Sequence, residues 1–245
     1  TLEHARQIEP RVKTAGRALW SPTTASADPR MVINALLADA RAAGIDVRLG
    51  TAYQQVYPGR VETSGGPFTA GYVVNCGGLY ADRIARDFGF SQRYVILPFK
   101  GLYLYSSEPA GRLKTNIYPV PDLNFPFLGV HYTVTVDGHS KIGPTAMPAF
   151  WREHYHGLDN FSFRELWEIC TRELGLCFSA GFDFRGLAVA ELKKISRKYL
   201  VKQASRLIEG VSLKDYNEWG RPGIRAQLLD TERRTLVMDF VLEGD

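Results

Sequence analysis

His131 is the first residue whose type and position could do chemistry. It lies in a predicted strand, Gly129–Thr135, after the sequence Pro126-Phe127. Side chains alternate between the two faces of a strand, so His131 points away from Val130 and Tyr132, towards a cavity or solvent. An imidazole in such a position can exchange a proton near neutral pH. A structural or surface histidine is the alternative interpretation.

Arg225 is the second such residue. It lies between the apolar Ile224 and Ala226, in a stretch that opens with Gly223. A guanidinium among apolar neighbours is costly to bury without an anionic partner, and its fork of donors suits a carboxylate. The sequence therefore indicates either an anion-binding arginine or a surface ion pair.

A glycine pair, Gly77-Gly78, lies between a predicted strand over 72–76 and a predicted helix over 81–88. Such a turn directs backbone N–H groups and a helix N-terminus beyond the strand, which suits a pyrophosphate. Plain connections use the same turn, and the stronger dinucleotide fingerprint, G-x-G-x-x-G after a first strand, is absent from the 245 residues. A bound dinucleotide would need its main phosphate loop elsewhere.

Composition excludes several classes of protein. There are 30 basic and 26 acidic residues with no long basic run, which argues against a nucleic-acid binder and is compatible with an anionic substrate. Cys76, Cys170 and Cys177 are too few and too irregular for a disulfide framework or a zinc site, and His154-x-His156 is too isolated for a metal site. No stretch reaches the roughly 18 apolar residues of a membrane span. We expect a cytoplasmic protein, free or peripheral to a membrane, with no bound metal.

Hydrophobic periodicity predicts the elements that must position these residues. Helices are expected within 1–17, 30–43, 81–88, 161–174 and 186–208. The helix over 30–43 has an apolar face formed by Ile33, Leu36, Leu37 and Ala40. Strands are expected at 45–49, 52–57, 60–63, 68–69, 72–76, 95–98, 102–106, 114–120, 129–135, 140–143 and 236–242, and 220–227 is expected to be a glycine-flanked loop or a short strand. A βαβ-like first third followed by an antiparallel middle predicts an α+β fold with two interleaved domains.

Six stretches, in their order and spacing, make the chain resemble the L-2-hydroxyglutarate dehydrogenase/oxidase family. They are LWSPTT (19–24), VNCGGLYAD (74–82), PFKGLY (98–103), YPVPDLNFPFLGVH (118–131), GPTA (143–146) and GIRAQ (223–227). The fourth stretch is the most specific, and the resemblance covers nearly the whole chain. The family belongs to the D-amino-acid-oxidase-like flavoproteins, a group that includes glycerol-3-phosphate dehydrogenase.

The resemblance implies part of a FAD-binding α/β domain, interleaved with a substrate domain built on a mostly antiparallel sheet with flanking helices. Residues 1–95 would belong to the FAD-binding domain, with a linking loop at 14–29, and residues 96–219 to the substrate domain. Residues 220–245 would return towards the FAD-binding domain. Family members carry G-x-G-x-x-G at the N-terminus and another FAD-contacting segment at the C-terminus. We therefore expect the chain to be an internal fragment that holds FAD weakly or not at all by itself.

The resemblance also implies the reaction and its residues. The intact protein would oxidise L-2-hydroxyglutarate, or a similar small 2-hydroxy acid, to the 2-oxo acid by hydride transfer to FAD. His131 would be the base and Arg225 would hold the substrate carboxylate. The residues that would line the substrate pocket are Lys100, Tyr103, Tyr118 and Thr145. The residues that would contact FAD are Val56, Cys76, Gly77 and Gly78.

Two positions depart from the family pattern. Lys100 stands where the family has arginine, so a point charge replaces a fork of donors, and Thr145 stands where it has asparagine. The exact substrate therefore stays open, with an amino acid or glycerol 3-phosphate as alternatives within the superfamily. An inactive fragment or a non-catalytic binding module is the alternative from another class. The sequence does not determine the oligomeric state or the electron acceptor, which would be oxygen or a quinone.

Overall fold

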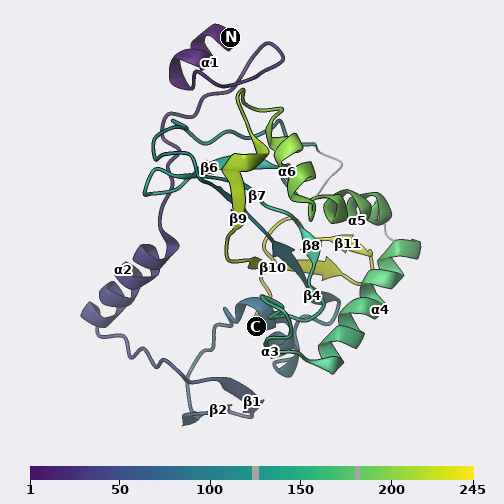
Figure 1. Ribbon diagram of the computed structural model, residues 1–245. Helices are drawn as coiled ribbons and strands as arrows, with labels where there is room; N and C mark the ends of the chain where they lie inside the picture. The colour runs from purple at the N-terminus through teal and green to yellow at the C-terminus, as the bar shows by residue number, and fades with distance from the viewer. Residues whose placement is uncertain (123–126, 180–182) are drawn as a thin grey trace. The chain divides into compact units, whose positions relative to one another are not determined.

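The structure, a computed structural model, describes residues 1–122, 127–179 and 183–245. They form two compact units, each built from two separate stretches of chain. The first unit contains Thr1–Asp28 and Pro98–Arg225, and the second contains Pro29–Leu97 and Ala226–Asp245. Helices occur together with antiparallel strand pairs, so the predicted α+β class with interleaved parts is confirmed (Figure 1).

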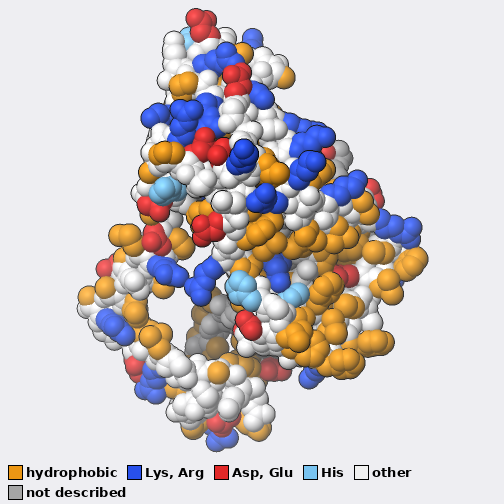
Figure 2. Space-filling view, in the orientation of Figure 1, with side chains coloured by type: hydrophobic (Ala, Val, Ile, Leu, Met, Phe, Trp, Pro, Cys, Tyr) orange, Lys and Arg blue, Asp and Glu red, His pale blue; other side chains and the backbone are white. Residues whose placement is uncertain are grey.

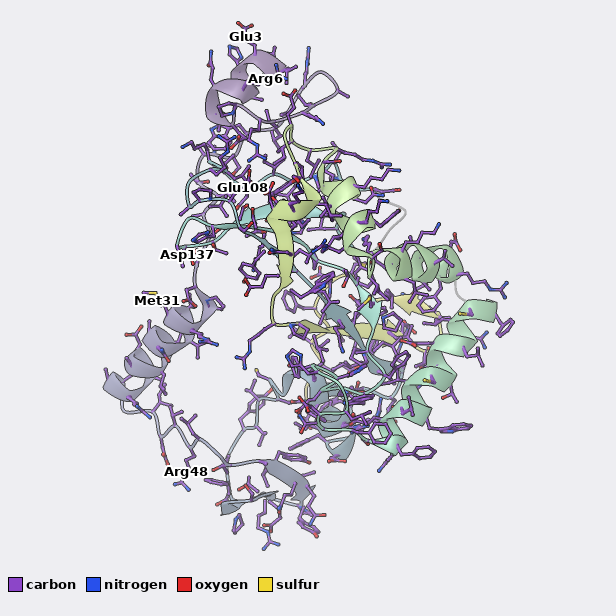
Figure 3. The ribbon with its side chains drawn as sticks, in the orientation of Figure 1. Glu3, Arg6, Met31, Arg48, Glu108 and Asp137 are labelled. Atoms are coloured by element: carbon purple, nitrogen blue, oxygen red, sulfur yellow. The ribbon has the colours of Figure 1, made fainter. Side chains whose placement is uncertain are left out.

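Residues 1–28 belong to the first unit, whereas the sequence placed them in the FAD-binding domain. Helix α1 (Leu2–Ile8) leads into a segment in which Val12 is buried within the apolar core of the first unit. The Arg11 guanidinium binds the Glu108 carboxylate at 2.9 Å (Glu108 is labelled in Figure 3). The local sequence pattern shows neither contact, because each joins residues far apart in the chain.

A four-stranded antiparallel sheet forms the centre of the first unit. Its strand order is β6 (His131–Val134), β7 (Ser140–Gly143), β5 (Leu104–Ser106) and β9 (Tyr216–Trp219). Helix α6 (Arg197–Ala204) covers one face, and its N-cap Ser196 accepts a hydrogen bond from the Tyr199 N–H. The side chains buried between helix and sheet include Leu104, Tyr132, Ile142, Leu200, Val201, Ala204 and Tyr216. Burying these apolar side chains against each other provides most of the unit's stability.

The opposite face of this sheet carries the polar residues. Register pairs His131 with Gly143, and Thr133 with Lys141. Since Tyr132 and Ile142 face α6, alternation directs their neighbours His131, Thr133 and Lys141 to the other side. The predicted orientation of His131 is therefore confirmed relative to Tyr132, although the side chain is buried, with 7% exposed, rather than open to solvent.

A second four-stranded sheet has the order β11 (Thr235–Leu236), β10 (Gly223–Asp230), β4 (Tyr94–Gly101) and β8 (Met147–Pro148). The unit boundaries fall at 97/98 and 225/226, inside β4 and β10, rather than at the expected 95/96 and 219/220. Six of the eight residues of β4 are buried, the apolar run Val95–Phe99 and then Lys100. A continuous apolar run gives no local signal of a domain boundary, which explains why the boundary in β4 differs from the expected one.

The second unit contains α2 (Pro29–Ala42), η1 (Gly78–Tyr80), α3 (Ala81–Asp87) and a meander of β1 (Tyr53–Tyr57), β2 (Arg60–Thr63) and β3 (Gly66–Phe68). The predicted helix over 30–43 is confirmed, but none of its residues is buried among the described residues. The strands expected at 45–49 and 72–76 do not form. Ile45 donates its N–H to the Ala40 carbonyl and closes the helix end, and Val74 is 74% exposed. An apolar run becomes a strand only where a partner strand supplies hydrogen bonds.

Helices α4 (Phe163–Ser179) and α5 (Phe184–Lys193) correspond to the amphipathic segments expected from periodicity. Ile169 and Leu176 of α4 are buried, but a second set of apolar side chains faces solvent. Figure 2 shows hydrophobic side chains gathered over this helix. The exposed members on α4 are Phe163, Trp167, Leu174 and Phe178.

Three other expectations change. Residues 114–120 form only the isolated bridge Ile117–Tyr132 instead of a strand, and the last strand is β11 rather than 236–242. The segment expected over 220–227 extends to Asp230 as β10. A short 3-10 helix, η2 (Leu213–Asp215), precedes β9.

Gly143→Ala should destabilise the protein strongly. A Cβ at this position would lie 2.6 Å from the Leu102 carbonyl oxygen and 2.9 Å from Tyr103 Cδ1, at a φ of +145°. Overpacking and an unfavourable backbone conformation together should lower the free energy of unfolding by at least about 1–3 kcal/mol.

Gly175→Ala is the matched control, because a Cβ there meets nothing within 4 Å in the middle of α4. Alanine should raise the free energy of unfolding by about 0.5–1 kcal/mol there. Urea denaturation of both variants measures the two effects. Equal stability of Gly143→Ala and the parent protein would contradict the close packing at this glycine.

Candidate active site

His131 is held in one tautomer by its surroundings. Its Nδ1 lies 2.9 Å from the Gly129 carbonyl oxygen, and its ring stacks on Tyr118 with centroids 4.3 Å apart. A carbonyl oxygen only accepts hydrogen bonds, so Nδ1 carries the proton. In the neutral ring, Nε2 is therefore left with a lone pair that can accept a proton.

Burial lowers the pKa of His131 below its ordinary value of 6.5, and the hydrogen bond to Gly129 opposes this shift. The positive charges of Lys141 and Lys194 lower the same pKa further. His131 is consequently neutral at pH 7, which is the form that a base requires.

Two of the tyrosines predicted to line the substrate pocket, Tyr103 and Tyr118, lie on the side of the sheet that carries His131, and their contact with substrate stays a prediction. Tyr118 stacks on the imidazole, and a Cβ on Gly143, the register partner of His131, would touch the Tyr103 ring. Burial raises the pKa of Tyr103, with further contributions from Tyr118 and Tyr105. The imidazole therefore stacks on one phenol ring, that of Tyr118, while the Tyr103 ring lies beside the register partner of His131.

Lys141 also belongs to this face, and sequence reasoning missed it. Its ammonium lies 4.4 Å from the centroid of Tyr103 and 5.7 Å from that of Tyr105. The signal in the sequence was its position two residues before Gly143, which places it on the same side of β7 as that glycine. A single lysine in a short strand otherwise resembles any surface lysine.

Arg225 is exposed near the start of β10. Its guanidinium carbon lies 5.3 Å from the centroid of the Phe127 ring, and Phe127 packs on Phe99 with centroids 4.9 Å apart. Among the residues that the structure describes, no acidic side chain forms an ion pair with Arg225. The guanidinium is therefore supported by an aromatic ring and open to an external anion.

Lys100 does not join Arg225. Alternation along β4 directs Lys100 to the side opposite Phe99, whereas Arg225 and Phe99 both contact Phe127. Lys100 is 9% exposed, and burial lowers its pKa. Burial also lowers the pKa of His154, and the charge of Lys100 adds to that shift. Its contact with substrate stays a prediction.

Thr145 uses its hydroxyl to join two stretches of backbone. The oxygen accepts a hydrogen bond from the Leu102 N–H at 3.0 Å and donates one to the Lys100 carbonyl at 3.1 Å. Its side chain is therefore committed to the junction between β4 and the turn after β7. Gly101 lies at the same junction, where a Cβ would be 3.3 Å from Pro144 and 3.9 Å from the Gly223 carbonyl oxygen. Three stretches of the resemblance, PFKGLY, GPTA and GIRAQ, thus meet here.

The second unit contains a cavity of about 920 Å³. Of the four residues predicted to contact FAD, Val56 lines this cavity and Cys76, Gly77 and Gly78 do not. The Gly77 N–H donates to Asn75 Oδ1 at 3.0 Å, and a Cβ on Gly77 would lie 2.7 Å from Ile84 Cδ1. Gly77 thus has a structural reason to be glycine, and its N–H is already used.

The cavity lining fits only part of a FAD molecule. Its apolar residues suit an adenosine group, whereas Arg60 is the one basic side chain among the described lining residues. The apolar lining residues include Val56, Val61, Phe68, Val73, Val74, Ile96 and Leu228. A pyrophosphate would therefore need donors beyond this lining.

Among the described residues, no three His, Cys, Asp or Glu side chains lie close enough to hold a metal ion. No helix in the described ranges is long and apolar enough to cross a membrane.

Comparison with known proteins gives a family and several relatives. The family model of FAD dependent oxidoreductases (DAO) matches residues 1–239. The mitochondrial L-2-hydroxyglutarate dehydrogenase of Nematostella vectensis is 41% identical over 182 residues, covering 71% of this chain and 37% of that protein. The human mitochondrial enzyme is 39% identical, covering 74% of this chain and 39% of that protein. The L-2-hydroxyglutarate dehydrogenase of Indibacter alkaliphilus is 32% identical, covering 100% of this chain and 62% of that protein.

Solved structures show the same fold. Glycine oxidase from Geobacillus kaustophilus matches with a TM-score of 0.59 at 20% identity, covering 95% of this chain and 51% of that one. The chain spans about two fifths of the length of the Nematostella vectensis and human dehydrogenases that it matches. The resemblance inferred from six stretches of sequence is confirmed: the chain belongs to the family of FAD dependent oxidoreductases.

Proposed function

We propose that the protein containing this chain oxidises a small 2-hydroxy acid, L-2-hydroxyglutarate or a close relative, to the 2-oxo acid with FAD as hydride acceptor. The observation that carries the proposal is a neutral imidazole with a free Nε2, set among tyrosine rings on one face of a sheet. The names of the relatives support the choice of substrate.

His131 would remove the hydroxyl proton. When hydride leaves C2 of a hydroxy acid, its O–H proton must leave as well, and a neutral imidazole can accept it at Nε2. The Gly129 carbonyl fixes the tautomer, while Tyr118 fixes the plane of the ring. Burial disfavours the charged imidazolium, so the ring is neutral and able to accept a proton before the substrate binds.

Arg225 would hold the substrate carboxylate. Its guanidinium can make two parallel hydrogen bonds to the two carboxylate oxygens, which fixes both position and orientation. The Phe127 ring beneath it restricts the side chain without using its donors. Orientation of the carboxylate in turn aligns the C2–H bond for transfer.

FAD, when bound, would supply the two-electron acceptor, which no side chain can provide. Val56 and the other apolar residues around the cavity of the second unit would contact the adenosine end. Contacts of Cys76, Gly77 and Gly78 with the cofactor stay predictions. In this proposal the protein's residues position the substrate and move the proton.

His131→Ala in the full-length enzyme should lower the rate of flavin reduction by roughly 10²–10⁴-fold, because the proton loses its acceptor. In the wild type, the same rate should fall as pH drops through a pKa below 6.5, since burial disfavours the imidazolium. Stopped-flow reduction by L-2-hydroxyglutarate across a pH series measures both effects.

The exposed His139→Ala is the control and should react at the wild-type rate. Flavin content and melting temperature should be recorded for both variants. A His131→Ala enzyme that folds, holds FAD and reduces it at wild-type speed would remove His131 from the mechanism.

Arg225→Lys in the full-length enzyme should lower kcat/KM by roughly 10–100-fold, because a lysine cannot make the paired contact to a carboxylate. Steady-state kinetics measure the change, with Arg221→Lys as the control at a nearby exposed arginine. A variant within about twofold of the wild type would show that Arg225 is a surface residue.

A further inference from the structure

Lys141 is a cation without an acidic partner. It is half-buried on β7, and within the described ranges no carboxylate forms an ion pair with it. The nearest groups that stabilise its charge are the faces of Tyr103 and Tyr105. Burial lowers its pKa, so the surroundings replace only part of the hydration that the ammonium has lost.

The register of the sheet places Lys141 beside the candidate base. Thr133 pairs with Lys141 and His131 pairs with Gly143, so His131 and Lys141 are diagonal neighbours on one face of two adjacent strands. Diagonal neighbours in an antiparallel pair lie roughly 7–8 Å apart at their backbones. The two side chains affect each other electrostatically, because the charge of Lys141 lowers the pKa of His131.

An anion would complete this arrangement, and the described residues do not provide one. A half-buried ammonium beside a neutral imidazole keeps the base unprotonated, but it also attracts a negative group to the same face. The two tyrosine rings lie against the ammonium itself, and within the described ranges no carboxylate forms an ion pair with it. A substrate with a second carboxylate would provide that anion.

We propose that Lys141 binds the distal carboxylate of a dicarboxylic 2-hydroxy acid whose C2 hydroxyl lies at His131. The proposal rests on the proposed function and extends it, since Lys141 becomes the residue that selects dicarboxylic over monocarboxylic 2-hydroxy acids. Arg225 would hold the carboxylate next to C2, and Lys141 the one at the far end of the carbon chain. Lys100, on the other side of β4 from Phe99, has no part in this selection.

Lys141→Met in the full-length, FAD-loaded enzyme tests the proposal. Methionine keeps an unbranched stem against the tyrosine rings and removes the charge. For L-2-hydroxyglutarate, kcat/KM should fall roughly 10–100-fold, the effect of losing one charged contact. For L-2-hydroxypentanoate, which has the same carbon chain and a single carboxylate, it should stay within about twofold.

Lys202→Met, at an exposed position of α6, is the matched control and should change neither value. Lys141→Arg keeps the positive charge and should keep the preference for two carboxylates. An equal loss on both substrates in Lys141→Met would show that Lys141 acts through the fold or through His131. No loss on either substrate would show that it binds neither. Both outcomes overturn the proposal.

Calorimetry on the wild type gives a second measurement that needs no variant. 2-Oxoglutarate should bind roughly 10–100-fold more tightly than 2-oxopentanoate, because only the former has the distal carboxylate. Equal binding overturns the role of Lys141. If no 2-hydroxy acid reduces the flavin but the dicarboxylate preference is present and depends on Lys141, the proposed reaction fails while the assignment of Lys141 stands.

Discussion

The absence of a side chain at Gly143 lets the end of β7 lie against the backbone of Leu102, and the candidate active site depends on this close approach. It keeps β7 between β5 and β6, so that His131, Lys141 and Tyr103 are presented on one face. The Thr145 hydroxyl then joins the following turn to the end of β4. Backbone packing thus brings the three side chains to one face, where Lys141 contacts Tyr103.

The electrostatics of the site follow from the same arrangement. Helix α6 covers one face of the sheet, which carries apolar side chains, so the charged side chains lie on the other face. There, Lys141 is stabilised by aromatic rings and His131 is held neutral by burial. Arg225, in the same unit, also rests on an aromatic ring. A surface of this kind is prepared for an anion, because its positive charges are positioned before any ligand arrives.

Several of these features could be predicted from the sequence. Alternation along 129–135 gave the face of His131 relative to Tyr132, and the motif order gave the family. The partners of Thr145 and the ion pair of Arg11 with Glu108 could not be predicted, since both join residues far apart in the chain. The expected strand over 72–76 does not form, for a related reason. Apolar residues indicate burial, but a segment becomes a strand only where a neighbouring strand provides partners for its backbone hydrogen bonds.

The division of each unit into two stretches has a consequence for synthesis on the ribosome. The Arg11 side chain donates a hydrogen bond to the Glu209 carbonyl, 198 positions later in the chain. At roughly 5–20 residues per second, the N-terminal segment waits on the order of 10–40 s before its partner has been made. During that time the core around Val12 lacks its later members, Leu200, Val201, Ala204 and Ile208. The first unit therefore cannot complete its folding until residues near Glu209 have been made.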